Sequence, residues 1–315
     1  MTYDDFMAEW SDPATDHVGA STSGSTGKPK PVKLAKADML MSARATIEFF
    51  GIGPDDTLAT PLAADYIAGK MMAVRALDCG ARLLVEKPSR SPLSSLSPDT
   101  RIKLVAIVPQ QIEGLIASKC EVQHVIVGGA PTSPEAETAA TQAWPRTSWW
   151  ATYGMTETCS HVALRPFGDS RYHALPGVEF SLAEGDRLVI SRLGATWSPV
   201  VTNDIVDLID NHTFIFRGRA DNAIISGGLK IHPEEVERLI APALDPYRFY
   251  VTARTSAEWG SEVALVVEGA APADGGRALL DAAALLAGRI RRPRSIIWLD
   301  SLPLTDSGKI KRQTF

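Results

Sequence analysis

Four short apolar runs, each closed by a glycine, proline or polar residue, set the strongest limit on how this chain can fold. They lie at residues 58–62, 83–85, 104–108 and 125–127. Apolar runs of this length without alternation are typical of strands that are buried on both faces of a parallel sheet. Helix-like stretches at residues 37–50 and 67–77 fit as crossover connections between strands. We therefore predict an α/β region up to about residue 180, with ligands at the carboxyl ends of its strands.

The pattern changes after Pro176. Shorter β-like pieces at residues 187–191, 205–209 and 213–217 predict a second, smaller sheet. From residue 221 onward the chain has its own mix of elements, with a helix that begins at Pro233, a helix at 278–287, and strands at 250–252, 263–267 and 295–299. We predict a large α/β domain at residues 1–220 and a smaller α+β domain at residues 221–315.

Composition and charge exclude several classes of protein. Hydrophobic residues make up 45% of the chain and charged residues 22%, which is ordinary for a globular protein. The net charge of -5, without a long basic run, disfavours nucleic acid as a partner. No apolar window reaches the length of a membrane span, and the acidic N-terminus does not resemble a signal peptide, so we expect a cytoplasmic protein. The spacing of Cys79, Cys120 and Cys159 predicts free thiols and no zinc site.

A loop with two glycines, five hydroxyls and two lysines occupies residues 21–30, Ser-Thr-Ser-Gly-Ser-Thr-Gly-Lys-Pro-Lys. Glycines allow backbone N–H groups to approach an anion closely, hydroxyls donate further hydrogen bonds, and lysine supplies positive charge. A P-loop NTPase motif is excluded because no Gly-Lys-Ser/Thr follows Gly24 at the required spacing. The loop is therefore either a phosphate-binding loop or a flexible Ser/Gly linker.

The same loop resembles the phosphate loop of the adenylate-forming superfamily, which includes acyl-CoA synthetases, nonribosomal-peptide adenylation domains and luciferases. Five further motifs of that family follow in its order: Gly-Gly-Ala-Pro at 128–131, Tyr-Gly-Met-Thr-Glu at 153–157, Thr-Asn-Asp at 202–204, Gly-Arg-Ala-Asp at 218–221 and Pro-Leu-Thr-Asp-Ser-Gly-Lys at 303–309. Six motifs in the family's order are not expected by chance. The resemblance implies a large α/β domain that carries a small, mobile α+β C-terminal domain.

The resemblance also implies a nucleotide site. In the family, the phosphate loop holds the phosphates, the second motif contacts adenine, the tyrosine stacks on the purine, and an acid and an arginine reach the ribose or phosphates. The corresponding residues here are Thr22, Ser23, Gly24, Ser25, Thr26, Gly27, Lys30, Gly129, Ala130, Pro131, Tyr153, Gly154, Asp204 and Arg219. Without the resemblance, Tyr153 would be core packing, and Arg219 would be half of a surface ion pair.

Catalytic roles follow from the same resemblance. Thr156 corresponds to the hydroxyl on the α-phosphate, and Glu157 to the carboxylate that holds magnesium, a hard cation that prefers oxygen ligands. Lys309 corresponds to the lysine that enters the active site and stabilises charge during adenylation. Asp221 corresponds to the hinge about which the small domain rotates. As isolated features, Glu157 and Lys309 would be solvated surface charges.

This sequence departs from the family in length. Family members carry well over a hundred residues ahead of the phosphate loop, whereas about twenty precede it here. We interpret the chain as a short form and expect that a homodimer could cover apolar surface left by the missing subdomain.

The stretch at residues 61–70, together with 74–77, is most similar to the o-succinylbenzoate-CoA ligases of menaquinone synthesis. The substrate-binding residues that this similarity implies are Tyr66, Gly69, Lys70 and Met155. We predict that the Lys70 ammonium meets a distal carboxylate of the acid, that Gly69 leaves room for its ring and that Tyr66 packs on it. The alternative is a surface lysine on the solvent face of its helix.

The implied reaction joins a carboxylic acid to AMP, using ATP and Mg²⁺, and then passes the acyl group to the thiol of coenzyme A. Two alternatives remain: an adenylating ligase of another acid that loads a carrier-protein thiol or an amine, and a nucleotide-binding regulatory module without turnover. The presence of both Glu157 and Lys309 disfavours the regulatory module, because binding alone does not need a mobile lysine.

Overall fold

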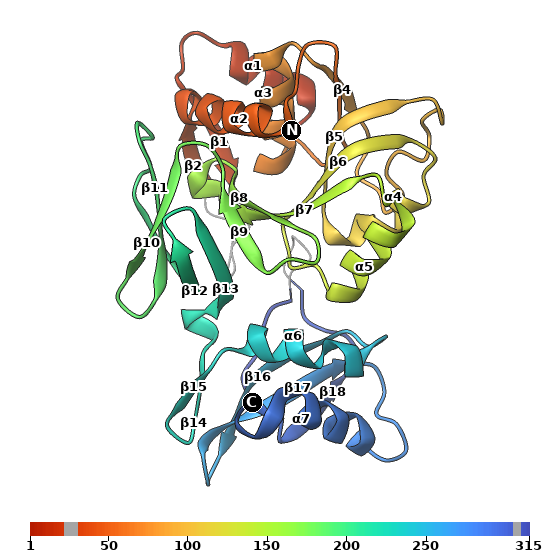
Figure 1. Cartoon of the computed structure of the whole chain (residues 1–315), viewed down its shortest axis with the longest axis vertical. Helices are drawn as coiled ribbons and strands as arrows, with labels where there is room; N and C mark the ends of the chain where they lie inside the picture. The colour runs from red at the N-terminus through yellow and green to blue at the C-terminus, as the bar shows by residue number, and fades with distance from the viewer. Residues whose placement is uncertain (22–30, 305–309) are drawn as a thin grey trace. The chain divides into compact units, whose positions relative to one another are not determined.

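The computed structural model describes residues 1–21, 31–304 and 310–315 of the chain (Figure 1). It contains a sheet of eleven strands, a sheet of three and two separate strand pairs. No helix within these ranges has the length and apolar character that crossing a membrane requires.

The chain begins with a helix that the apolar patterns did not predict. Helix α1 (Tyr3–Ser11) starts at a capping box: the Asp5 backbone N–H donates to Thr2 Oγ1 at 3.1 Å, and the Thr2 N–H donates to Asp5 Oδ2 at 2.7 Å. The helix fully buries Phe6, which packs in one cluster with Met71 and Val74. The N-terminal residues are therefore part of the core.

An antiparallel strand pair frames the phosphate-loop segment. Strands β1 (His17–Ser21) and β2 (Pro31–Ala35) pair so that Ser21 lies opposite Pro31. The two ends from which residues 22–30 depart are therefore adjacent.

The predicted parallel sheet is confirmed. Its strands run in the order β4-β3-β5-β6-β7 and pair in parallel. They are β3 (Thr57–Thr60), β4 (Arg82–Val85), β5 (Arg101–Ile107), β6 (Glu121–Val127) and β7 (Ser148–Gly154). The intervening helices are α2 (Lys36–Phe50), α3 (Ile67–Cys79), η1 (Pro109–Gln111), α4 (Ile112–Ile116) and α5 (Pro134–Ala143). Helices α2 and α3 both end at a glycine in the left-handed region, Gly51 and Gly80, as helices commonly do.

The predicted second, smaller sheet after Pro176 is wrong. Strands β8 and β9 continue the parallel sheet with antiparallel pairs, and β13 pairs with β9, so the later strands join the same sheet. The free edge of β9 accounts for this outcome, because an unpaired strand edge recruits another strand. The elements are η2 (Thr156–Thr158), β8 (His161–Pro166), β9 (Arg171–Ala174), β10 (Val178–Ala183), β11 (Arg187–Arg192), β12 (Val200–Asp210) and β13 (Thr213–Arg219).

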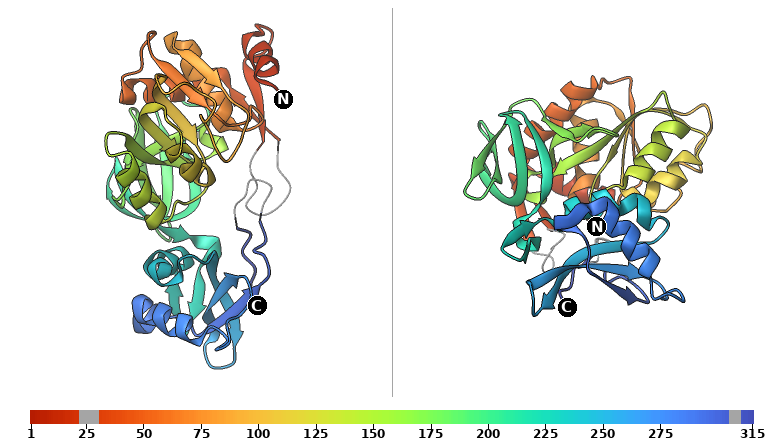
Figure 2. Two further views of the ribbon diagram at one scale, coloured as in Figure 1. Left: turned by 90° about the vertical axis from the view of Figure 1, so that its right-hand side faces the viewer. Right: turned by 60° about the horizontal axis from the view of Figure 1, so that its bottom comes forward.

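The last hundred residues form the predicted α+β arrangement. Helices α6 and α7 cover one face of the three-stranded sheet β16-β17-β18 (Figures 1 and 2). The elements are η3 (Ala220–Asn222), β14 (Ile224–Ser226), β15 (Leu229–Ile231), α6 (Pro233–Leu244), β16 (Phe249–Ser256), β17 (Gly260–Glu268), α7 (Arg277–Arg291) and β18 (Ser295–Leu299). In α6, Val236 and Ile240 are buried as expected, but Leu239 is 39% exposed and Leu244 completes the apolar face instead.

The chain divides into two compact units. The first comprises Met1–Ser181, Val189–Val201 and Leu208–Ile215, and the second comprises Leu182–Leu188, Thr202–Asp207 and Phe216–Phe315. The domain boundary at residues 220 and 221 stays a prediction.

Candidate active site

Part of the sequence-derived site lies outside the residues that the structure describes. These residues are Thr22, Ser23, Gly24, Ser25, Thr26, Gly27, Lys30 and Lys309. The other site residues are all described and fall into three groups.

The first group lies at the carboxyl ends of the parallel strands. The Gly128 N–H, directly after β6, donates to the Ile107 carbonyl at the end of β5, at 3.1 Å. A Cβ on Gly128 would lie 2.4 Å from Thr152 Oγ1 on β7, so only glycine allows this approach. Gly129 has a φ of +86°, in the region that favours glycine. The turn at 128–131 is therefore held beside the strand that carries Tyr153.

Tyr153 belongs to an aromatic cluster on the sheet. Its ring is half-buried and meets the rings of Tyr172 and Phe214 edge to face, with centroids 5.7 and 5.0 Å away. Such pairs add stability beyond the area that they bury. The ring orientation is thus fixed by neighbours, and its stacking on a purine stays a prediction.

The turn between β7 and β8 carries Thr156 and Glu157. A Cβ on Gly154 would lie 2.3 Å from the Ser160 carbonyl oxygen, so this position also requires glycine. Thr156 is buried, whereas Glu157 is exposed, and its carboxylate has no ion-pair or hydrogen-bond partner among the described residues. The turn contacts β2, the strand that begins at Pro31 immediately after the phosphate-loop segment. Glu157 is thus available to a ligand at the base of that segment.

Glu157 fits a magnesium ion that is shared with a nucleotide. In the ranges that the structure covers, no three His, Cys, Asp or Glu side chains gather as a metal cage. Magnesium in phosphate-transfer sites is typically held by one or two carboxylates, while phosphate oxygens and water complete the shell. Glu157, which is exposed and has no partner among the described residues, matches that pattern.

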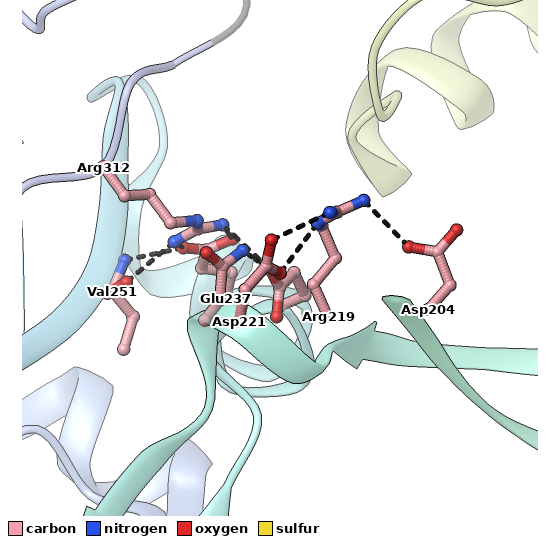
Figure 3. Close-up of polar contacts among 8 residues, drawn as sticks. Asp204, Arg219, Asp221, Glu237, Val251 and Arg312 are labelled. Carbon is pink, nitrogen blue, oxygen red and sulfur yellow. Dashed lines mark hydrogen bonds and ion pairs between the residues drawn. The ribbon is translucent and has the colours of Figure 1, made fainter. Parts of the chain in front are cut away.

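The second group is a network around Arg219 (Figure 3). Arg219 Nη1 donates to Asp204 Oδ1 at 3.1 Å, and Nε and Nη2 donate to the two oxygens of Asp221, each at 2.9 Å. Hydrogen bonds from Arg219 lower the pKa of the Asp221 carboxyl, which stays ionised. The arginine therefore connects the ribose-binding candidate, Asp204, to the hinge candidate, Asp221, rather than forming an isolated surface pair.

A partly buried ion pair in the second unit fixes the end of the chain (Figure 3). Arg312 forms a bidentate pair with Glu237 of α6, in which Nη2 donates to Oε2 at 2.7 Å and Nη1 donates to Oε1. The Val251 N–H donates to Glu237 Oε1 at 2.6 Å, and Arg312 donates back to the Val251 carbonyl at 2.7 Å. The segment after residue 309 is thereby attached to α6 and β16.

The third group is the expected acid-binding segment, in which the structure contradicts the surface-lysine alternative for Lys70. Lys70 is not a surface lysine: it is 1% exposed, and its ammonium lies 4.8 Å from the centre of the Phe6 ring in α1. A Cβ at Gly69 would lie 2.4 Å from the Ala63 carbonyl oxygen and 2.8 Å from Tyr3 Oη, so glycine here allows the preceding loop and α1 to approach α3 closely. Tyr66 is 48% exposed. Helix α1, which the sequence patterns did not reveal, packs against α3 through Phe6, and the substrate-binding roles of Tyr66, Gly69 and Lys70 stay predictions. Met155, the remaining substrate-binding candidate, is half-buried in the β7–β8 turn.

Arg75 is the residue of this segment that the sequence analysis missed. It is 1% exposed, and no described carboxylate pairs with it. Nη2 donates to Ser160 Oγ at 2.7 Å, Nη1 approaches the Met72 sulfur at 3.5 Å, and Nε is buried without a partner. Burial lowers the pKa of Arg75 from its ordinary value to about 9. A basic residue inside the apolar run of α3 was the available signal.

Arg75 and Ser160 continue into a buried histidine. Ser160 Oγ lies 3.4 Å from His161 Nδ1, and His161 Nε2 lies 3.1 Å from Thr46 Oγ1. Burial, together with the nearby Arg75, holds the pKa of His161 well below its usual range, so the ring is neutral. The positive charge of this network therefore resides on Arg75.

Known proteins resemble this chain over most of its length. The AMP-binding enzyme family matches residues 21–191. The indoleacetate–CoA ligase of Aromatoleum aromaticum is 28% identical over 95% of this chain and 66% of its own length. The 2-succinylbenzoate–CoA ligase of Salmonella typhimurium is 30% identical over 80% of this chain and 58% of its own. The chain thus spans no more than about two thirds of either relative.

Solved structures share the fold. An acyl-CoA synthetase (AMP-forming)/AMP-acid ligase II-like protein from Dyadobacter fermentans is 30% identical, with a TM-score of 0.63 over 98% of this chain and 91% of its own. The o-succinylbenzoate CoA synthetase of Bacillus subtilis, in complex with ATP and magnesium, is 21% identical, with a TM-score of 0.78 over 93% of this chain and 68% of its own.

These similarities confirm the resemblance that the six motifs indicated, and the architecture confirms the predicted fold class. The match extends from the strand before the phosphate loop to β11 and so includes the turn that carries Thr156 and Glu157. The chain belongs to the family of AMP-binding, adenylate-forming enzymes.

Proposed function

We propose that this protein activates a carboxylic acid with ATP to form an acyl-adenylate and transfers the acyl group to the thiol of coenzyme A. The observation that carries the proposal is the exposed carboxylate of Glu157, which has no partner among the described residues, beside buried Thr156 in a turn that contacts β2. The presence of Lys309 as well disfavours a module that only binds a nucleotide, because binding alone does not need a mobile lysine. The names of both curated relatives support an acid–CoA ligase.

The reaction has two steps. A carboxylate oxygen of the acid attacks the α-phosphorus of ATP, the bond to the β-phosphate oxygen breaks, and pyrophosphate leaves. The thiol sulfur then attacks the acyl carbon, AMP leaves, and the thiol proton goes to solvent. Adenylation converts a poor leaving group into a good one, and the protein contributes by positioning the reactants and stabilising charge.

The residues of this chain have separate tasks in the proposal. Thr156 donates its hydroxyl to the α-phosphate, and Glu157 holds magnesium, which supplies positive charge that offsets the charge developing on the phosphates. The Bacillus subtilis relative, solved with ATP and magnesium, supports these cofactors. Asp204 accepts hydrogen bonds from the ribose hydroxyls, since its two oxygens can accept from both.

The two domains also have separate tasks. We place the adenylation domain at residues 1–220 and the mobile domain at 221–315, with Asp221 as the hinge. Lys309 of the mobile domain stabilises charge during adenylation only. The Arg219–Asp221 ion pair, with two hydrogen bonds of 2.9 Å, fixes the orientation of the Asp221 carboxylate at the proposed hinge.

The preferred acid in this proposal is o-succinylbenzoate or a similar aromatic acid with a second carboxylate. The supporting observation is Arg75, a buried cation without a carboxylate partner among the described residues. A desolvated cation of this kind is stabilised when a ligand supplies the anion. Lys70 is a weaker candidate, because it lies five residues earlier, about 140° around the helix, and faces α1.

Pyrophosphate release over a panel of acids, each with and without coenzyme A, tests the proposal. We expect acid-dependent release with aromatic dicarboxylic acids and formation of the acyl-CoA thioester only when coenzyme A is present. ATP binding without release for any acid would favour a regulatory module. Release without thioester formation would favour a carrier-protein thiol or an amine as the acceptor.

A homodimer that covers the exposed apolar side chains of Leu77 and Val85 stays part of the proposal. Light scattering on the purified chain tests it.

A further inference from the structure

The turn that carries Thr156 and Glu157 is only six residues long, from Met155 to Ser160, between β7 and β8. It contains a residue in an unfavourable conformation: Cys159 has a φ of +64°, and a residue with a side chain costs roughly 1–3 kcal/mol in that region. Such a conformation persists only where the surroundings hold it. Something other than backbone preference therefore maintains the turn.

The Thr158 hydroxyl bridges the entry and the exit of this turn. Its Oγ1 accepts from the Met155 N–H at 3.2 Å, and its one proton is within donating distance of the Ser160 carbonyl oxygen, at 2.8 Å, and of the Met155 carbonyl oxygen, at 3.0 Å. Thr158 is 1% exposed, so its hydroxyl is not available to a ligand. One side chain thus ties the two backbone positions that flank Thr156 and Glu157.

Cys159 holds the turn from the other side and carries no chemistry of its own. Its side chain is 1% exposed and packs with Val18 and Met39. Burial raises the pKa of its thiol to about 12, so it stays protonated at neutral pH and is a poor nucleophile. Its contribution is apolar packing, while Thr158 provides the polar bridge.

We propose that Thr158 is a positioning residue for adenylation: its buried hydroxyl fixes the turn so that the Thr156 hydroxyl and the Glu157 carboxylate are directed to the α-phosphate and its metal. This inference rests on the proposed function, because it assigns Thr158 a task only if Glu157 holds magnesium. The reasoning is geometric, since a misplacement of about 1 Å in a catalytic group can lower a rate about a hundredfold.

The test compares Thr158→Val, which keeps the shape and removes the hydrogen bonds of the hydroxyl, with Thr158→Ser, which keeps the hydroxyl. Thr147→Val is the matched control: Thr147 lies just before the other end of β7, and its hydroxyl donates to the Val122 carbonyl at 2.7 Å. For each variant, acid-dependent pyrophosphate release is measured against magnesium concentration, together with KM for the acid and the thermal midpoint.

We expect Thr158→Val to lower kcat about tenfold and to raise the magnesium concentration for half-maximal rate several-fold, with KM for the acid unchanged. A tenfold decrease in kcat corresponds to an increase of about 1.4 kcal/mol in the activation free energy. Thr158→Ser should stay within about twofold of the unaltered protein. Thr147→Val should change only the thermal midpoint, since it removes a comparable hydrogen bond away from the turn.

Glu157→Gln, measured in parallel, distinguishes a failure of the positioning role of Thr158 from a failure of the metal-binding role of Glu157. If Glu157→Gln changes the magnesium dependence and Thr158→Val does not, the positioning role is wrong and the proposed function stands. If neither variant changes it, the metal-binding role of Glu157 is wrong as well. If Thr158→Ser loses as much activity as Thr158→Val, the hydroxyl bridge is not what positions the turn.

Discussion

Replacing Arg75 with methionine should make the protein more stable and impair its use of dicarboxylic acids. The guanidinium is fully buried, has one hydrogen bond to a side-chain hydroxyl and lacks a carboxylate partner in the described part of the chain. Methionine fills a similar space without a charge. Residues of functional sites often lower the stability of the folded protein, and we expect this of Arg75.

The magnitude follows from the pKa of Arg75. Its fall from the ordinary value to about 9 corresponds to about 5 kcal/mol against the charged form in the folded protein. Loss of the charged hydrogen bond to Ser160 offsets about 1.5–3 kcal/mol of the gain. We therefore expect Arg75→Met to raise the free energy of unfolding by about 2 kcal/mol, or the thermal midpoint by roughly 4–8 °C.

The pH dependence provides a second check on this reasoning. Because the pKa of Arg75 is lower in the folded protein than in the unfolded chain, the charged form destabilises the fold at every pH below about 9. That penalty shrinks as the pH rises above about 9, since the folded protein then loses the proton first. The stability advantage of Arg75→Met should accordingly be complete at pH 7 and smaller at pH 10.

The assay measures thermal midpoints and KM for o-succinylbenzoate, for a monocarboxylic acid and for ATP. We expect KM for o-succinylbenzoate to rise tenfold or more, with ATP unaffected. Arg44→Met is the control, because Arg44 is exposed and its ion pair with Asp78 is worth at most about 1 kcal/mol. If Arg75→Met has a lower thermal midpoint and an unchanged KM for every acid, Arg75 neither destabilises the fold nor contacts the substrate.

Four further outcomes are expected. Lys309→Ala should abolish acid-dependent pyrophosphate release and spare the reaction of preformed acyl-adenylate with thiol; equal loss of both would remove its assigned role. Lys70→Met should leave KM for o-succinylbenzoate within about twofold, because the ammonium faces α1, whereas a tenfold rise would restore Lys70 as the substrate contact. Arg312→Met should lower the free energy of unfolding by about 1.5–3 kcal/mol, since it removes the charged hydrogen bonds to the partly buried Glu237 carboxylate; urea titration measures this. Below pH 6.5 the free energy of unfolding should fall as the pH is lowered, because His161 is protonated in the unfolded chain and not in the folded protein. His161 contributes up to about 1.4 kcal/mol per pH unit to this fall. If the free energy of unfolding of His161→Gln falls equally steeply with pH, the assignment to His161 is wrong.

Local sequence patterns were sufficient for most of the elements. The unbroken apolar runs predicted β3, β4, β5 and β6, and the proline and acids at the start of α6 predicted its first turn. Patterns of this kind report whether a segment is buried and which conformation it prefers.

Partners that are distant in sequence could not be predicted in this way. Lys70 and Arg75 occur in the same apolar helix, and their order along the chain does not reveal that one faces Phe6 and the other Ser160. The pairing of β13 with β9 could not be predicted either. The residues of a strand indicate which of its side chains are buried, but they do not specify which strand lies beside it.

Residue types and their spacing were sufficient for the family, the order of the motifs and the presence of glycine at residues 128 and 154. These features are local, because they depend on residue type and spacing alone. Only the tertiary structure decided that α1 covers the expected acid-binding segment, that Arg75 is buried without a carboxylate partner in the described ranges, and that the Thr158 hydroxyl ties the turn carrying Glu157. The physical reason is that desolvation and packing depend on which side chains surround a group, and folding brings those side chains together from distant parts of the chain.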